Sequence, residues 1–411
     1  MYLCFIQVLP VPEPFGLPSA VAKFGCPAKF VLPLFFAILI YAQSKLWSQK
    51  TRAPRLNPFY EEYSSTSNFA LKSCLLWSIM PKKILIIAPS WIGDLVMSQA
   101  LFKLLKKQAP SCSIDVLASL ALHQVLIHMP EVDNYLTLPF EHGELKLFAR
   151  LAFAKKLREN FYTHAYVLPN SFKSALIPFW AKIPERIGWR GEYRYVLLND
   201  IKPPIAKTGR MVERLVALGI KTNGQLPTPL ELPQLYVSKK QLDATLGRLK
   251  INLSQKPILA LCPGGEYGIT KRWPTAYFAK IAQIKKSEGW EVWIFGGPKD
   301  ETFAQEIQTQ SDNSCLDLAG KINLSEVIDL LSLATTVVTN DSGLMHIAAA
   351  LNRQLIAIYG STSPKFTPPL TYKAKIVSLN LPCSPCFKRE CLLKHMKCLN
   401  DLRPELVLQS F

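Results

Sequence analysis

The amino-acid sequence predicts an α/β protein built from two doubly wound domains. The first observation is the length of 411 residues, which is too long for one ordinary hydrophobic core. The second is an alternation, from Lys83 onward, between short β-branched apolar runs and longer runs with helical spacing, which is typical of a parallel sheet with crossover helices. The third is that this alternation starts again after a Pro- and Gly-rich linker over 202–234.

Residues 1–79 differ from the rest of the chain and are expected to form an irregular N-terminal extension. They are rich in Pro and aromatic residues, and their apolar run 30–42 spans only 13 residues. A bilayer-spanning helix needs about 20 apolar residues, and this run is also interrupted by Pro33. Two interpretations stay open: an upstream extension with little structure, or a weak anchor or signal-like segment.

The first domain is expected over residues 80–236. The run 95–108 has apolar residues at helical spacing and ends in lysines, which stabilise a helix C-terminus. A second crossover helix is expected over 143–160, and a short helix around 211–219. The candidate strands are KILIIAP (83–89), SIDVLAS (113–119), NYLTLPF (134–140), HAYVLPN (164–170) and ERIGW (185–189).

The second domain is expected over residues 237–411 and repeats the plan of the first. Two such domains that face each other leave a cleft between the carboxyl ends of their strands, where nucleotides usually bind. The candidate strands are PILALCPGG (257–265), EVWIFGG (291–297), SCLDLAG (314–320), TTVVTND (335–341), LIAIYG (355–360) and AKIVSLN (374–380).

The composition indicates a folded protein with an anionic partner. Hydrophobic residues make up 49% of the chain and charged residues 19%, which excludes a disordered chain. The formal net charge of +18 favours nucleic acid, an acidic membrane face or a phosphorylated substrate. Because zinc-finger spacing and RNP-like motifs are absent from the sequence, no nucleic-acid partner is expected. Several of the ten cysteines stand singly in apolar segments, which is typical of reduced cytosolic proteins; these are Cys74, Cys112, Cys262 and Cys315.

Asp94 follows the first strand at the turn into the first helix. Asp is favoured at a helix N-cap, so the residue type leaves two interpretations open, a capping residue and a catalytic base at the mouth of the cleft. The G-x-G-x-x-G pattern of nicotinamide dinucleotide sites is absent between Ile87 and Leu95, which disfavours a dehydrogenase.

A loop in the second half has the features of a phosphate site. Gly264 and Gly265 allow a close backbone approach after a strand, and Lys271 and Arg272 supply positive charge. The alternative for the two cations is a solvated basic pair before a helix that starts at Pro274.

A further strand ends in Asp341, Ser342 and Gly343 just before a helix of small residues, whose N-terminal amides could bind a pyrophosphate. Asp341 or Ser342 would cap this helix with or without a phosphate. His346 lies one turn further on, where it either binds a phosphate or satisfies a core contact.

An ordered series of motifs runs from residue 80 to the C-terminus: PSWIGD with SQAL, VLPNSFKSAL, GWRGEYRY, LLND, CPGGEYG with KRWP, TNDSGLMHIAAALN and YGSTSPKFTPPL. This series resembles glycosyltransferase family 9. Within this family, VLPNSFKSAL and GWRGEYRY are most similar to the branch that adds the second heptose of lipopolysaccharide.

The resemblance implies a GT-B architecture of two facing Rossmann-like domains with an inter-domain cleft. It implies an inverting enzyme that moves L-glycero-D-manno-heptose from ADP-heptose to the first heptose of the lipopolysaccharide inner core, with heptosyl-Kdo2-lipid A as acceptor. The domain 80–236 would bind the acceptor and 237–411 the nucleotide sugar. The expected location is cytoplasmic, peripheral to the inner membrane.

By its place in the motif, Asp94 matches the proposed catalytic base of the family. Lys271 and the amides of the helix N-terminus would stabilise the charge that develops on the leaving pyrophosphate. No Asp-x-Asp pair follows a strand in the expected place, so no catalytic metal or other cofactor is expected. The expected donor-binding residues are Gly264, Gly265, Lys271, Arg272, Asp341, Ser342, Gly343, Leu344 and His346.

The acceptor carries phosphates and carboxylates, and the first domain offers four cations near strand ends, Lys173, Arg186, Arg190 and Arg194. Each is alternatively a solvated surface charge. The rival functions are a nucleotide-sugar epimerase of similar fold, a family 9 transferase with another sugar or acceptor, and a non-catalytic lipopolysaccharide-binding protein.

Four cysteines near the C-terminus form a C-x2-C-x4-C-x6-C pattern, Cys383, Cys386, Cys391 and Cys398. A structural zinc site usually has two separated C-x2-C knuckles, and only one is present. A reduced loop is therefore favoured over a structural metal site.

Overall fold

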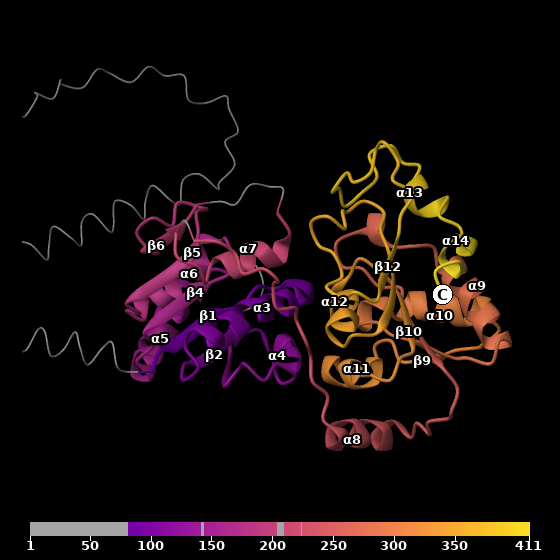
Figure 1. The fold of residues 1–411 in the computed structure, drawn as a ribbon, viewed down its shortest axis with the longest axis horizontal. Coiled ribbons are helices and arrows are strands. Elements are labelled where there is room, and N and C mark those ends of the chain that lie inside the picture. Colours follow the sequence, from indigo (N-terminus) through magenta and orange to yellow (C-terminus); the bar gives the residue numbers. More distant parts are fainter. Residues whose placement is uncertain (1–80, 141–143, 204–208, 223) are drawn as a thin grey trace, which may run out of the picture. The chain divides into compact units, whose positions relative to one another are not determined.

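The computed structural model describes residues 81–140, 144–203, 209–222 and 224–411. Within these ranges the chain forms two parallel six-stranded sheets with helices on their faces (Figure 1). The predicted N-terminal extension, with its apolar run 30–42, lies outside the described residues. No helix in the described ranges is both long and apolar enough to cross a membrane.

The first sheet has the strand order β3-β2-β1-β4-β5-β6. All five predicted strands are confirmed, and the sixth, β6, was missed because it is a three-residue edge strand that borders the Pro-rich linker. The strands are β1 (Lys83–Ile87), β2 (Ser113–Ala118), β3 (Asn134–Thr137), β4 (His164–Val167), β5 (Glu185–Trp189) and β6 (Asp200–Lys202). The helices are α3 (Ile92–Gln108), α4 (Leu120–Leu126), α5 (Leu147–Leu157), η1 (Arg158–Asn160), α6 (Phe172–Trp180) and α7 (Met211–Ala217).

The second sheet has the strand order β12-β11-β10-β7-β8-β9, and all six predicted strands are confirmed. The strands are β7 (Ile258–Cys262), β8 (Glu291–Ile294), β9 (Leu316–Asp317), β10 (Thr336–Asn340), β11 (Gln354–Ile358) and β12 (Ala374–Val377). The helices are α8 (Lys239–Leu249), η2 (Ile269–Lys271), α9 (Thr275–Ser287), η3 (Pro298–Asp300), α10 (Glu301–Gln310), α11 (Leu324–Leu331), α12 (Gly343–Ala350), α13 (Lys397–Asn400) and α14 (Pro404–Leu408).

Both sheets have the same doubly wound order, with the first strand of each half in the middle beside the fourth. The strand order reverses between β1 and β4 in the first sheet and between β7 and β10 in the second. In sheets of this kind, ligands bind in the crevice outside the carboxyl ends of the strands at the reversal point. A ligand site is therefore expected at the loops that follow these four strands.

The central strands are buried on both faces because their side chains alternate between two cores. In β1, Ile84 and Ile86 join one buried cluster and Leu85 and Ile87 join another. The first of these clusters continues without a break from α3 into α12 and the second sheet. A third cluster fills the other face of the second sheet, against α9 and α10.

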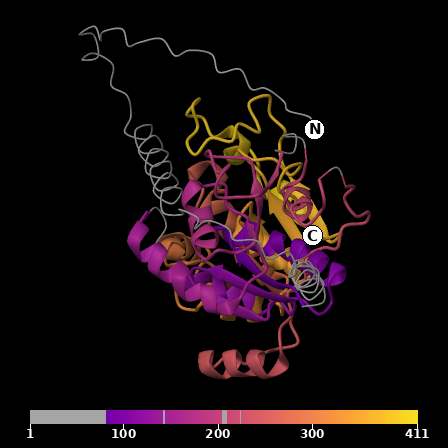
Figure 2. The ribbon, with the colours of Figure 1, turned by 90° about the vertical axis from the view of Figure 1, so that its left-hand side faces the viewer.

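Helix α8 lies apart from the two sheets, at the foot of Figures 1 and 2. It begins at a Ser238 cap that accepts a hydrogen bond from the amide of Gln241. It packs on α11, where Oγ1 of Thr245 donates to Oδ2 of Asp329 at 2.8 Å.

Candidate active site

Helices α3 and α12 cross closely because each has a glycine near its start. A Cβ atom on Gly93 would lie 2.6 Å from Cδ2 of His346, and one on Gly343 would lie 2.9 Å from Cβ of Ile92. Neither position has room for a side chain. The first turn of α3, from the first sheet, therefore lies directly against α12, from the second sheet.

Asp94 lies in the first turn of α3 but does not cap it. The N-cap position belongs to Trp91, and no side chain caps this helix. Burial raises the pKa of the Asp94 carboxyl to about 6; the positive charge of Lys271 opposes this shift, and the negative charge of Asp341 adds to it. The structure thus shows Asp94 as a buried titratable group rather than a capping residue.

Lys271 and Asp341 form an ion pair beside Asp94. Nζ of Lys271, at the end of η2, lies 2.7 Å from Oδ2 of Asp341, which follows β10. Asp341 is 4% exposed, and its Oδ2 also accepts a hydrogen bond from Oγ1 of Thr362 at 2.5 Å. Water is largely excluded from this pair, so its charges act strongly on their neighbours.

The N-terminus of α12 presents unpaired amides at the same place. Ser342 occupies its N-cap without a side-chain cap, so the first amides of the helix, at Gly343 and Leu344, lack intrahelical partners. His346 is 5% exposed, and burial lowers the pKa of its imidazole to about 4. His346 is therefore neutral at neutral pH, and the site holds one imidazole without a charge.

The glycine-rich loop after β7 is tied to the same region. The side-chain amide of Asn340, at the end of β10, donates to the carbonyl of Pro263 at 2.6 Å. The backbone of Gly264 leaves room for the carboxylate of Asp300, which occupies the space of a Cβ. The Arg272 guanidinium donates to the carbonyl of Gly265 at 3.0 Å.

Two of the four predicted acceptor-binding cations lie at the carboxyl edge of the first sheet. Lys173 is in the first turn of α6 and donates to the carbonyl of Glu144 at 3.4 Å. Arg190 follows β5 directly and is exposed. Their loops are joined by the Glu192 carboxylate, which accepts a hydrogen bond from the amide of Phe172 at 2.6 Å.

Arg194 is buried beneath these loops. It is 1% exposed and donates to the carbonyls of Pro169 and Trp189, each at 2.6 Å. Burial lowers the pKa of its guanidinium to about 10. Its observed contacts brace the loops that carry Lys173 and Arg190.

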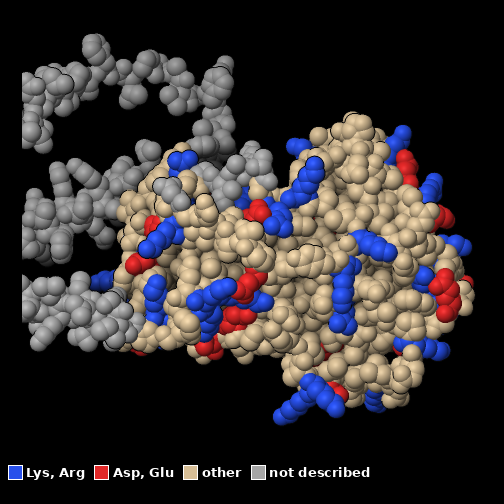
Figure 3. Space-filling view, viewed as in Figure 1, with Lys and Arg blue, Asp and Glu red and all other residues tan. Residues whose placement is uncertain are grey.

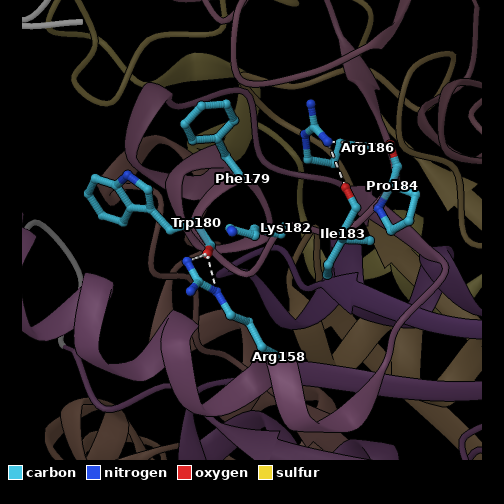
Figure 4. A pocket seen from close by; sticks show the side chains of 7 residues that line it. All are labelled: Arg158, Phe179, Trp180, Lys182, Ile183, Pro184 and Arg186. Atoms are coloured by element: carbon cyan, nitrogen blue, oxygen red, sulfur yellow. Dashed lines mark hydrogen bonds between the residues drawn. The ribbon is translucent and has the colours of Figure 1, made fainter. Parts of the chain in front are cut away.

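The fourth cation, Arg186, is not brought together with the other three. It lies near the start of β5, and its guanidinium donates to the carbonyls of Ile183 and Leu197. Figure 4 shows it at the rim of a hollow that also contains Arg158 and Trp180. This hollow lies at the amino edge of the sheet, whereas Asp94 lies at the carboxyl edge.

The four C-terminal cysteines line one hollow of about 230 Å³. Burial raises the pKa of Cys398, and the neighbouring thiols of Cys386, Cys383 and Cys391 raise it further. Within the described ranges, no group of three or more His, Cys, Asp or Glu side chains is arranged to hold a metal ion. All four cysteines are free thiols.

Two residues at the site were missed by the sequence-based prediction, Asn340 and Thr362. Asn340 ends β10, at the reversal point of the second sheet, and Thr362 lies shortly after the neighbouring strand β11, so their position near the carboxyl edge was predictable. Their partners were not, because the hydrogen bonds join segments that are 77 and 21 residues apart in the chain.

Asp94, Lys271 and the N-terminal amides of α12 together suit acid–base and charge-stabilising chemistry. A carboxylate with a pKa near neutrality suits a general base, and a cation beside unpaired helix amides suits a developing negative charge. The base comes from the first sheet, and the cation and amides come from the second. The arrangement is thus suited to a group transfer in which an anion leaves.

Comparison with known proteins agrees with this chemistry. Residues 150–397 match the model of a family described as glycosyltransferase family 9 (heptosyltransferase). Lipopolysaccharide heptosyltransferase 2 of Escherichia coli strain K12 is 42% identical over 338 residues, which are 80% of this chain and 97% of that protein. Lipooligosaccharide heptosyltransferase 2 of Haemophilus influenzae is 47% identical over 307 residues, which are 72% of this chain and 88% of that protein.

A solved structure shows the same fold. The structure described as E. coli ADP-heptose LPS heptosyltransferase II matches with a TM-score of 0.71 and 40% sequence identity. The match covers 80% of this chain and 97% of that chain.

Proposed function

Since the chain belongs to glycosyltransferase family 9, we propose that it transfers L-glycero-D-manno-heptose from ADP-heptose to the first heptose of the lipopolysaccharide inner core. The fold is the GT-B arrangement of two Rossmann-like domains. The single observation that carries the proposal is the convergence of Asp94, Lys271 and the N-terminus of α12 at the reversal points of the two sheets. The names of the relatives favour transfer over the epimerase alternative.

Asp94 is proposed as the general base. In an inverting transfer, the acceptor hydroxyl attacks the anomeric carbon from the face opposite the leaving ADP. The hydroxyl proton passes to the Asp94 carboxylate, the new glycosidic bond forms, and the bond to the diphosphate oxygen breaks with its electrons on ADP. A pKa of about 6 keeps Asp94 ionised at neutral pH while leaving it more basic than an ordinary carboxylate.

The leaving diphosphate is proposed to be stabilised by Lys271 and the amides of Gly343 and Leu344. These groups are fixed before the reaction starts, so they stabilise the new charge without reorganisation. Because they supply positive charge directly, the reaction needs no cofactor. The proposed donor-binding residues are Gly264, Gly265, Lys271, Arg272, Asp341, Ser342, Gly343, Leu344 and His346.

The acceptor is proposed to bind at the carboxyl edge of the first sheet, with Lys173 and Arg190 facing its phosphates and carboxylates. Domain 80–236 would then serve the acceptor and domain 237–411 the donor. Arg194 would support the acceptor loops from beneath, and Arg186 would have no direct role.

A peripheral place at the cytoplasmic face of the inner membrane follows from this acceptor and from the net charge of +18. Figure 3 shows the Lys and Arg side chains scattered over the visible face with acidic side chains among them. Among the described residues, that face shows no continuous basic stripe of the kind that follows a nucleic-acid backbone.

The experiment that tests this function is transfer from ADP-heptose to two purified acceptors, Kdo2-lipid A and heptosyl-Kdo2-lipid A. The proposal predicts that mass spectrometry finds one added heptose on the second acceptor only. Transfer to Kdo2-lipid A alone would make the chain an enzyme of the first heptose, and transfer from another nucleotide sugar in preference would refute the donor.

A further inference from the structure

The Asp341 carboxylate makes its ion pair and its side-chain hydrogen bond through the same oxygen. Its Oδ2 lies 2.7 Å from Nζ of Lys271 and 2.5 Å from Oγ1 of Thr362. Asp341 is 4% exposed and Thr362 is 9% exposed, so water competes weakly for these bonds. Its other oxygen, Oδ1, accepts no hydrogen bond from any residue that the structure describes.

Thr362 lies on a turn after β11 that is itself held in place. The amide of Phe387 donates to the carbonyl of Ser361 at 2.8 Å. The hydroxyl of Ser384 donates to the carbonyl of Gly360. Both donors belong to the cysteine-rich C-terminal segment, which therefore fixes the backbone from which the Thr362 hydroxyl reaches Asp341.

The same segment holds the other partner of Asp341. The hydroxyl of Thr270, the residue before Lys271, donates to the carbonyl of Lys388 at 2.5 Å. Thr270 is 2% exposed. Lys271 and Thr362 thus reach Asp341 from two loops that are braced by one stretch of backbone.

From this geometry we propose that Thr362 is a positioning residue for the nucleotide sugar, acting through Asp341. This rests on the proposed function. A carboxylate held by Lys271 alone can rotate and exchange its oxygens, whereas a second donor on Oδ2 fixes its plane. Oδ1 is then kept for a hydroxyl of the donor. The hydrogen bond from Thr362 also partly neutralises the negative charge on Oδ2. The attraction between Oδ2 and Lys271 is then weaker, and the Lys271 ammonium can interact with the leaving diphosphate.

The test compares Thr362→Val, which removes the hydroxyl and keeps the shape, with Thr362→Ser, which keeps the hydroxyl. Thr245→Val is the matched control. Thr245 lies on α8, away from the site, and its hydroxyl also donates to a buried aspartate, Asp329, at 2.8 Å. For each full-length variant, kcat and both KM values are measured, together with calorimetric binding of ADP-heptose and the melting temperature.

We expect Thr362→Val to lower kcat/KM for ADP-heptose by about 10-fold or more, since it removes a hydrogen bond to a charged group. The KM for the acceptor should stay unchanged, Thr362→Ser should recover most of the loss, and Thr245→Val should lower only the melting temperature. The proposal is overturned if Thr362→Val keeps wild-type kcat/KM, or if the Ser variant is as impaired as the Val variant.

Binding separates this proposal from the function it rests on. A wild-type chain that binds ADP-heptose but does not transfer it would refute the assigned acceptor. In that case the role of Thr362 would be tested by the affinity for ADP-heptose alone. Weaker binding of ADP-heptose by Thr362→Val than by Thr362→Ser would support the positioning role, and equal binding would refute it.

Discussion

The pKa of Asp94 depends on its burial and on two charged neighbours, and mutation can separate the contributions of the two neighbours. Burial raises it, Lys271 lowers it and Asp341 raises it, to about 6. If Asp94 is the base, kcat/KM for the wild type should fall below about pH 6, because protonated Asp94 accepts no proton. This fall is the acidic limb of the pH profile. For an exposed aspartate, the acidic limb would lie near pH 3.9 instead.

Removing the two charged neighbours should move this limb in opposite directions. Lys271→Met removes the cation that favours the ionised form, so the limb should move to higher pH. Asp341→Asn removes the anion that disfavours it, so the limb should move to lower pH. The measurement is kcat/KM against pH for the three proteins; two shifts of the same sign would refute the assignment of the limb to Asp94.

Asp94→Asn should stabilise the fold while it abolishes transfer. The folded pKa of about 6 exceeds the ordinary value of 3.8, so the native state binds more protons between these values and stability falls as pH rises through that window. Asn does not ionise, so the variant should be more stable at pH 7.5 by at most about 3 kcal/mol, since one pKa unit corresponds to about 1.4 kcal/mol.

Denaturant unfolding at pH 7.5 and pH 5 checks this expectation. The advantage of the variant should shrink at the lower pH, where the wild-type carboxyl becomes protonated. A variant that is less stable than the wild type at pH 7.5 would show that ionised Asp94 is well solvated or well paired, contrary to its burial.

At the residue scale, the sequence predicted the positions of the candidate residues better than their contacts. Asp94 and Lys271 each follow a predicted strand and Asp341 ends one, and parallel sheets bring such residues to one edge. The fate of Arg194 was not predictable in this way. Whether a guanidinium in an aromatic loop is buried or solvated depends on carbonyls from a separate loop, such as that of Pro169.

At the scale of elements, the crossing of α3 and α12 depends on the absence of a side chain at Gly93. Gly93→Ala places a Cβ 2.6 Å from Cδ2 of the buried His346 and forces the helices apart. We expect a destabilisation of about 1–3 kcal/mol, as for other overpacked sites, together with weaker donor binding.

Gly247→Ala is the matched control for that change. Gly247 lies inside α8, and a Cβ there meets nothing within 4 Å. Alanine should therefore stabilise this helix by about 0.5–1 kcal/mol. Unfolding midpoints of the two variants should move in opposite directions; a Gly93 variant as stable as the wild type would mean that the helix crossing is loose.

Most of the strands could be predicted because the central strands of both sheets are buried on both faces, which gives continuous apolar runs such as KILII in β1. Strand β6 was not predicted because its three residues, Asp200–Lys202, begin and end with charged side chains. Edge strands pair on one side only, so their sequences are under weaker constraint than those of central strands.

At the scale of the whole molecule, the candidate site exists only when the two halves pack together. The base comes from α3 and the cation and amides come from the second sheet. Besides the α3–α12 crossing, His128 joins the halves through a hydrogen bond between its Nε2 and the hydroxyl of Ser325 at 3.1 Å. The sequence predicted two domains, but not these contacts, because they join residues about 200 to 250 positions apart whose partners are not marked by any local pattern.

The most direct test of the account is transfer of heptose from ADP-heptose to heptosyl-Kdo2-lipid A by the wild type and by Asp94→Asn, with a metal chelator present at pH 7.5. The account predicts full wild-type transfer in chelator and a loss of at least about 100-fold in a variant that remains folded, the scale typical of removing a general base. Wild-type rates in a folded Asp94→Asn chain would contradict the central claim that Asp94 takes the proton.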